Sequence, residues 1–321
     1  MWRSASDALP ASVFGSSSRD LWASCAPTLG LLDFPAHQFA GLAALGGVHA
    51  YLPMRHGICL PIAGACSDPR FLADLGSLAE EAGWDGVFLE DYIVDPRDPS
   101  TCDPWIGLAA IASRTTHIRL GTTVTPLARR RPWKVAREVT SLDWLSGGRM
   151  VLGVGAGDSK DRSWEQFGEE PDMRRRGEML DAALERIDRY WSGEVVPVPL
   201  QKPRVPIWIG GFWPRRRPVA RAARWDGAVM GWKLSNGDER LITSDDLLAL
   251  RAEIRRLRGG DDTRFDYVMG GAVRWSDDDA WHELVESMAK AGATWWLEYT
   301  GVNRPLDEIR TVVSKGPPRI G

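Results

Sequence analysis

Cysteine, long hydrophobic runs and net positive charge are all scarce in this sequence. The four cysteines, Cys25, Cys59, Cys66 and Cys102, form no Cys-x-x-Cys pair and no grouping with histidine. This pattern predicts free thiols in a reducing compartment and no metal site. No run reaches the roughly 18 to 20 apolar residues that a membrane span needs, and no secretion signal lies near Met1. We therefore expect a soluble, cytoplasmic protein.

The charge balance argues against partners that bind through a basic surface. The formal net charge is −3 and the sequence pI is about 6.0, so we expect no binding to nucleic acid and none to an anionic membrane. A small-molecule substrate is the expected partner. Hydrophobic residues make up 44% and charged residues 26% of the chain, which suffices for the core of one large domain.

Regular alternation of strand and helix patterns begins only near Met54. Residues 1–53 are rich in Ser, Ala, Gly and Leu without sustained periodicity, and we predict a loosely ordered N-terminal extension there. This segment is either sequence outside the native protein, with Met54 as the true start, or a short arm that binds a partner. Residues 54–321 are predicted to form the working domain.

Eight β-type apolar runs follow one another after Met54, with helix-patterned segments between them. Apolar residues three or four positions apart mark the helices, as in the segment after Pro132 and over Pro305–Val313. Eight alternations in a domain of this length predict a (β/α)8 TIM barrel, an α/β fold, rather than a doubly wound sheet. The predicted strands are Ile58–Ile62, Gly86–Glu90, Ile118–Val124, Arg149–Val154, Pro206–Ile209, Gly227–Met230, Tyr267–Val273 and Thr294–Glu298.

The active site of such a barrel lies at the C-terminal ends of its strands. Two of these ends, residues 121–123 and 153–157, carry the glycines and threonines that allow backbone contact with a ligand. Gly153, Gly155 and Gly157 do not form a dinucleotide fingerprint, because the third follows the second by two residues and no helix opens after it. We expect these glycines where a side chain would collide with a flat ring or with the barrel mouth.

The segment from Gly121 to Gly157, GTTVTPLARRRPWKVAREVTSLDWLSGGRMVLGVGAG, resembles the signature of the luciferase-like FMN- and F420-dependent oxidoreductases. Residues 79–88, 165–168, 205–211 and 223–229 resemble further pieces of that family in the same order, and the similarity spans about residues 58–300. The resemblance implies a (β/α)8 barrel that binds coenzyme F420 or FMN. It also implies a homodimer, as a family expectation only.

The resemblance assigns cofactor contacts to two strand ends. Thr122, Thr123 and Val124 match a bulged third strand in which relatives place a non-prolyl cis peptide, at Thr123-Val124, against the cofactor ring. Gly155 and Gly157 match the next strand end. An ordinary buried strand is the alternative for the first of these segments.

A phosphate site is implied at the next strand. Gly210 and Gly211, followed by Trp213-Pro214 opening a helix, match the turn that holds the cofactor phosphate, and a helix N-terminus offers free NH groups. A plain tight turn is the alternative. Lys233, just past the sixth strand, is a further candidate for binding an anion.

Two residues are candidates for catalysis. Asp158 matches a carboxylic acid that some F420-dependent relatives carry near the reactive edge of the ring, and it is a proton donor provided that it is buried enough to stay protonated. Its alternative role is to cap a loop. Tyr92 stands where relatives often have a histidine, so its hydroxyl would orient a substrate or bond the ring. We assign no catalytic histidine.

Three arginine triplets, 129–131, 174–176 and 215–217, follow strands on the same side of the predicted barrel. They would form a basic rim that suits a phosphate or the acidic oligoglutamyl tail of F420, and solvated surface charge is the alternative. The rim favours F420 over FMN. We therefore predict a flavin- or F420-dependent oxidoreductase that transfers hydride to, or oxygenates, a small organic substrate. The alternative is a catalytically inactive barrel that binds a flavin-like ligand or a protein partner.

Overall fold

The computed structural model describes residues 54–233, 239–271 and 278–317. Eight parallel strands close into a barrel, in the order β1, β2, β3, β5, β6, β7, β9, β10 and back to β1. The predicted (β/α)8 barrel is confirmed. The eight strands are β1 Arg55–Leu60, β2 Gly86–Leu89, β3 Arg119–Thr122, β5 Met150–Gly155, β6 Ile207–Trp213, β7 Gly227–Lys233, β9 Asp266–Gly271 and β10 Trp295–Tyr299.

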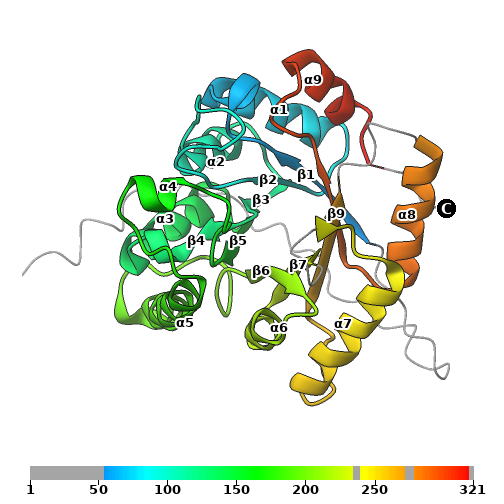
Figure 1. Cartoon of the computed structure of the whole chain (residues 1–321). Helices are drawn as coiled ribbons and strands as arrows, with labels where there is room; N and C mark the ends of the chain where they lie inside the picture. Colours follow the sequence, from blue (N-terminus) through cyan, green and yellow to red (C-terminus); the bar gives the residue numbers. More distant parts are fainter. Residues whose placement is uncertain (1–53, 234–238, 272–277, 318–321) are drawn as a thin grey trace, which may run out of the picture. The chain divides into compact units, whose positions relative to one another are not determined.

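The helices form a ring outside the strands (Figure 1). Several begin where the sequence supplies a cap. Asp68 and Asp103 accept backbone NH groups of the first turns of α1 and α2, each followed by proline at the first helical position. The helices are α1 Pro69–Glu81, α2 Pro104–Ala112, α3 Pro132–Leu145, α4 Ser163–Gln166, α5 Met173–Arg189, α6 Arg216–Ala222, α7 Ser244–Leu257, α8 Asp278–Lys290 and α9 Leu306–Ser314.

The third barrel strand is interrupted by a bulge. After β3 the chain continues as a two-residue strand, β4 (Thr125–Pro126), which also pairs with β5. The pairings of Gly121 with Val151 and of Thr125 with Val154 leave three residues, 122–124, opposite two, 152–153. The extra residue bends the strand and re-aims its side chains at the C-terminal end of the barrel.

Aromatic side chains fill the barrel interior. Phe88 stacks on Trp208 with ring centroids 5.2 Å apart, and Trp295 packs edge-on against both rings. Val151, Val268 and Leu297 complete this cluster, all of whose members are at most 1% exposed. The cluster is an aromatic plug, so open space for a ligand remains at the C-terminal mouth rather than along the axis.

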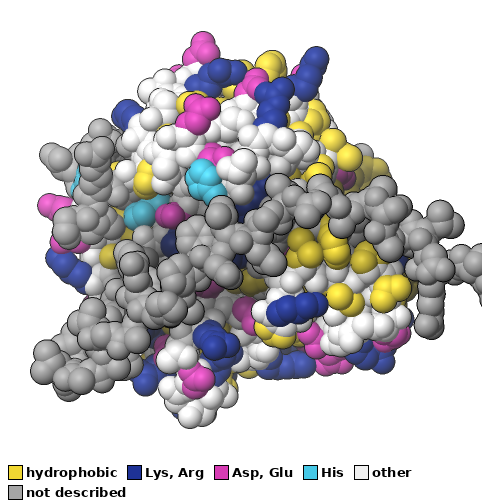
Figure 2. Space-filling model, turned by 180° about the vertical axis from the view of Figure 1, so that it is seen from behind, with side chains coloured by type: hydrophobic (Ala, Val, Ile, Leu, Met, Phe, Trp, Pro, Cys, Tyr) yellow, Lys and Arg dark blue, Asp and Glu magenta, His cyan; other side chains and the backbone are white. Residues whose placement is uncertain are grey.

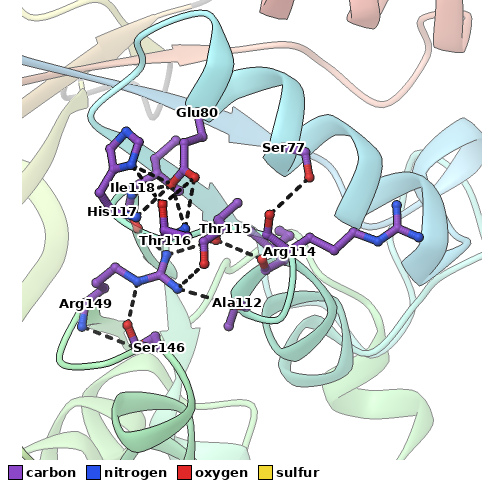
Figure 3. Close-up of polar contacts among 11 residues, drawn as sticks. Ser77, Glu80, Ala112, Arg114, Thr115, Thr116, His117, Ile118, Ser146 and Arg149 are labelled. Atoms are coloured by element: carbon purple, nitrogen blue, oxygen red, sulfur yellow. Dashed lines mark hydrogen bonds and ion pairs between the residues drawn. The ribbon is translucent and has the colours of Figure 1, made fainter. Parts of the chain in front are cut away.

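A polar network fixes the segment between α2 and β3 near the N-terminal ends of the strands (Figure 3). The Glu80 carboxylate accepts the backbone NH groups of Thr116, His117 and Ile118 at 2.8 to 3.0 Å. The Arg149 guanidinium donates to carbonyl oxygens of the same segment, including those of Thr115 and Ile118. Donors and acceptors that helix and sheet leave free are thus satisfied from both sides.

Burial alone would raise the pKa of Glu80, but these hydrogen bonds outweigh it and hold the pKa at about 2. The carboxylate is therefore charged near neutral pH, where it accepts all of these hydrogen bonds.

The predicted extension, residues 1–53, lies outside the described residues. Basic and acidic side chains are interspersed over the described part of the face in Figure 2, and hydrophobic side chains gather toward one side of it. Within the described ranges, no helix is both long and apolar enough to cross a membrane.

Candidate functional site

A cavity of about 1250 Å³ opens at the C-terminal mouth of the barrel. Its wall combines the ends of the barrel strands with α5, α6 and the loop after β5. Thr123, Asp158 and Gly211, which are far apart in sequence, all line it. The strand ends that the sequence singled out therefore meet at one site.

The floor of the cavity is formed by the bulge and two neighbouring strands. The Thr123–Val124 peptide is cis, at the position that the resemblance implied. The Val124 side chain lies over the backbone of β5 and β6, where a Cβ added to Gly155 or to Gly210 would come within 2.8 Å of it. Glycine at both positions lets Val124 lie flat across the barrel mouth.

The other two glycines of this series, Gly153 in β5 and Gly157 just after it, serve packing within the protein. A Cβ at Gly153 would lie 2.0 Å from the carbonyl oxygen of Thr122, and one at Gly157 would lie 2.5 Å from the Trp164 ring. Gly157 also has φ +82°, which favours glycine. A side chain at Gly153 or Gly157 would therefore collide with the bulge or with Trp164, whereas the sequence pattern predicts a collision with a flat ring or with the barrel mouth.

Thr123 is held by its neighbours at the edge of the floor. Its hydroxyl lies 3.2 Å from the Cys59 thiol of β1. Tyr299, the last residue of β10, also lines the cavity, and burial together with Cys59 and Glu90 raises the pKa of its hydroxyl well above the usual value. Both side chains offer neutral hydrogen-bonding groups to a ligand on the floor.

Glu90, directly after β2, is a site residue to which we assigned no role from the sequence. It lines the cavity with a side chain only 16% exposed and forms an ion pair with Arg97. Asp95 holds Arg97 from the other side at 2.6 Å, and the Arg97 guanidinium lies over the Tyr92 ring. Burial raises the pKa of the Glu90 carboxyl in spite of Arg97. Its position at the end of a predicted strand could have suggested Glu90 as a candidate, but the fixed arginine beside it depends on the fold of the loop.

Tyr92 lines the same side of the cavity. Burial, with the charges of Glu90 and Asp158, raises the pKa of its hydroxyl, so Tyr92 is a hydrogen-bonding group rather than a base near neutral pH. No described histidine lines the cavity. His56 lies at the opposite end of the barrel, where burial lowers its pKa to about 4.

The family model for luciferase-like monooxygenases matches residues 52–309. The chain belongs to this family. A curated relative, the F420-dependent glucose-6-phosphate dehydrogenase of Microbacterium testaceum (strain StLB037), is 34% identical over 172 residues, which are 47% of this chain and 50% of that protein. The chain spans about half the length of the curated relatives it matches.

Solved structures share the luciferase-like barrel. An F420-dependent secondary alcohol dehydrogenase in complex with an F420-acetone adduct has a TM-score of 0.64 at 16% identity, over 82% of this chain and 99% of that one. The oxygenating constituent of 3,6-diketocamphane monooxygenase from Pseudomonas putida, in complex with FMN, has a TM-score of 0.59 at 14% identity, over 84% and 99%. The resemblance inferred from the sequence is confirmed.

One predicted contact does not line the cavity of this luciferase-like barrel, and another lies outside the described residues. Thr122 is fully buried, and its hydroxyl donates to the carbonyl oxygen of Gly153 at 2.8 Å, so it faces the bulge and not the cavity. Lys233 ends β7, but its side chain lies outside the described residues.

The predicted phosphate turn at Gly210 and Gly211 is wrong in its local structure. Both glycines line the cavity, but they lie within β6, which pairs with β7 as far as Trp213. The following helix, α6, begins only at Arg216. The prediction fails because the hydrogen-bonded pairing of β6 with β7 continues through both glycines, where the sequence predicted a turn.

Asp158 lines the cavity but is exposed, and its Oδ1 accepts the backbone NH of Lys160 at 2.9 Å. Asp158 therefore lacks the burial that a proton donor requires. Its hydrogen bond to the Lys160 backbone fits the alternative role, which is to cap the loop. A donor role for Asp158 stays a prediction without that support.

The predicted basic rim is also only partly right. Arg129 has no exposed side-chain surface, and with Arg176 it sandwiches the Trp164 ring at 3.8 and 4.1 Å. Arg130 is bound to Asp91. Residues 174 and 215–217 do line the cavity, so the basic charge is concentrated on the α5–α6 side instead of surrounding the mouth.

Proposed function

We propose that this protein is an oxidoreductase that uses reduced F420, or alternatively FMN, to reduce or oxygenate a small organic substrate. The observation that carries the proposal is the cavity floor, where Val124 crosses Gly155 and Gly210 at the mouth of a closed barrel. This floor is an apolar surface made largely of backbone and one aliphatic side chain, which suits the face of a planar heterocycle. The volume of about 1250 Å³ leaves room for a substrate above it.

The cofactor, when bound, supplies the hydride or the reducing equivalents. The chain's own residues bind the cofactor and the substrate and orient them. Thr123 and Tyr299 offer hydroxyl groups at the edge of the floor, and the plug beneath them excludes water from that side. Glu90 is the carboxyl placed to exchange a proton at the cavity wall, since burial raises its pKa and Arg97 fixes its position.

F420 is favoured over FMN for two reasons. The curated relative named above is F420-dependent by name. The arginines on the α5–α6 side of the cavity also suit a ligand with more negative charge than one phosphate. FMN remains the alternative, because the structural neighbour from P. putida binds it.

The test is a titration of the purified full-length chain with F420 and with FMN, followed by absorbance and by fluorescence. Saturable binding of F420 with reduction of a substrate or its reverse supports the proposal. Binding without turnover on a broad panel of alcohols, aldehydes and sugar phosphates would support the inactive flavin-binding barrel. If the chain binds neither F420 nor FMN, both the oxidoreductase and the inactive flavin-binding barrel are rejected.

We also infer a cytoplasmic location. Cys59, Cys66 and Cys102 are buried and free among the described residues, which suits a reducing compartment. Fractionation of cells that express the tagged chain checks this, and recovery in a secreted or membrane fraction would contradict it.

A further inference from the structure

Two barrel strands continue their inward faces from the aromatic plug into the wall of the cavity. Side chains alternate along a strand, so residues two positions apart point to the same side. Leu297 of β10 belongs to the plug and Phe88 of β2 does as well. Tyr299 and Glu90, each two residues further on, line the cavity. Strand periodicity therefore places a phenol and a carboxyl on the mouth side of the plug.

The strand register brings these two groups to one part of the mouth. Cys59 of β1 pairs with Tyr299 on one side and with Phe88 on the other. The strands β10, β1 and β2 are consecutive around the barrel, whereas the floor comes from the bulge after β3 and from β5 and β6. We call the part of the mouth that carries Tyr299 and Glu90 the β10–β2 arc. A ring that lies on the Val124 floor leaves this arc to the substrate.

Tyr299 is a neutral hydrogen-bonding group on the β10–β2 arc. Its side chain packs against the plug, as does that of Val229 of β7, which also lines the cavity. Burial raises the pKa of the Tyr299 hydroxyl, and the Thr123 hydroxyl beside it opposes this shift only in part. Near neutral pH the arc therefore offers a protonated phenol on an apolar base, which suits the oxygen of an uncharged molecule.

The charges behind the arc leave no surplus of positive charge for an anion. Arg97 does not line the cavity, and it is held between Glu90 and Asp95, so that two carboxyl groups surround one guanidinium. Among the described residues, the cations that line the cavity come from the loop after β5 and from the α5–α6 side, at positions 160, 174, 215–217, 221 and 224. A phosphate or carboxylate on the arc would lose hydration without gaining a cation.

We propose that the β10–β2 arc binds an uncharged alcohol or ketone through the Tyr299 hydroxyl, and that the Glu90–Arg97–Asp95 cluster rejects anionic substrates. This inference rests on the proposed function, because it assumes that the cofactor ring covers the Val124 floor. It assigns to Tyr299 the recognition of the substrate oxygen and to Asp95 a part in selectivity, although Asp95 does not line the cavity.

The binding test compares two ketones that share one skeleton and differ in charge. Methyl acetoacetate and acetoacetate are titrated into the full-length chain loaded with oxidised F420, or with FMN if only FMN binds. The fluorescence of the bound cofactor reports the dissociation constants, and a ketone does not react with an oxidised cofactor. We expect the uncharged ester to bind about 10-fold more tightly than the acid.

Turnover should follow the same order. The matched alcohols are methyl 3-hydroxybutanoate and 3-hydroxybutanoate, and glucose 6-phosphate is added because a curated relative is named for it. We expect kcat/KM for the uncharged alcohol to exceed that for either anion by about 10-fold or more.

A tyrosine variant locates the oxygen contact. Y299F should weaken binding of methyl acetoacetate about 5- to 10-fold and change the cofactor affinity by no more than about twofold. Y267F is the matched control, because Tyr267 is a buried tyrosine of the neighbouring strand β9 whose hydroxyl donates to Asp262 at 3.0 Å and does not line the cavity. Thermal unfolding verifies that each variant is folded.

A charge variant tests the selectivity separately. D95N leaves Arg97 with one carboxyl partner, so the preference for the ester over the acid should fall about 3- to 5-fold. D98N is the control, because it removes one charge from the same loop, where the Asp98 carboxylate accepts the backbone NH of Ser100.

The outcomes separate this inference from the proposed function. Equal or tighter binding of acetoacetate, a preference for glucose 6-phosphate, or binding of the cofactor but of no ketone would overturn the uncharged substrate and leave the cofactor site standing. Equal losses in Y299F and Y267F would overturn the role of Tyr299, and equal changes in D95N and D98N that of Asp95. Failure of both F420 and FMN to bind would reject the proposed function and this inference together.

Discussion

The Cys59 thiol and the Thr123 hydroxyl lie 3.2 Å apart, which ties the first barrel strand to the bulge that forms the cavity floor. Both side chains are almost fully buried. The contact explains why a polar residue is tolerated at this point of the bulge, since a buried hydroxyl without a partner would be costly.

Replacing Thr123 with valine tests this contact with little change in shape. T123V should weaken cofactor binding about 5- to 10-fold and lower the free energy of unfolding by about 1 kcal/mol, because the hydroxyl is lost while the floor keeps its volume. T123S keeps the hydroxyl and is the control. Cofactor titration and urea unfolding measure both effects, and equal behaviour of T123V and T123S would contradict the role given to the hydroxyl.

The packing of Val124 on Gly155 predicts a rescue. G155A places a methyl group within 2.8 Å of Val124, and we expect it to destabilise the protein by about 1 to 3 kcal/mol and to reduce cofactor affinity. The double variant G155A/V124A removes the clash and should recover part of the stability. Urea unfolding of the single and double variants provides the measurement, and purely additive losses would show that the two residues do not compete for space.

Glu90 predicts the pH dependence of turnover. Burial raises its pKa, so a reaction that needs the protonated carboxyl should lose rate as the pH rises through that pKa. E90Q should lower kcat about 100-fold or more and remove this alkaline limb. Because Arg97 favours the charged carboxylate, R97Q should move the limb to higher pH. Y92F is the control, since its hydroxyl stays protonated in the same range and its loss should leave the limb in place.

Glu80 predicts stability in acid. Its folded pKa of about 2 lies below the usual value of 4.5, so its contribution is complete above about pH 4.5 and is lost as the pH falls toward 2. E80Q should reduce the free energy of unfolding by about 1 to 2 kcal/mol at pH 7, with the difference from wild type shrinking below pH 4. E81Q, at the exposed neighbouring position, should have no such effect. A pH-independent difference would place the loss elsewhere than in the carboxylate charge.

Much of the barrel could be predicted because the signals are periodic and local. Apolar runs gave all eight strands, and prolines at positions such as Pro132 gave the helix starts. Boundaries near glycine were less certain. Gly210 and Gly211 predict a turn by composition, yet they pair with the neighbouring strand β7, and pairing between two strands is not visible in one segment of sequence.

The site, too, could be predicted only in part. Thr123, Val124 and Gly155 could be placed because the barrel rule brings strand ends together. The exposure of Asp158 and the burial of Arg129 could not be predicted from the sequence, because they depend on how the loop after β5 folds around Trp164. Charge alone does not distinguish an arginine that meets solvent from one that stacks on an indole.

The aromatic plug of Phe88, Trp208 and Trp295 closes the barrel below the floor, so ligands enter and leave by the mouth alone. The cofactor and its co-substrate would then use the same entrance. If the cofactor lies on Val124 and its co-substrate binds above it, the co-substrate covers the cofactor, so we expect steady-state kinetics in which the cofactor binds first and leaves last.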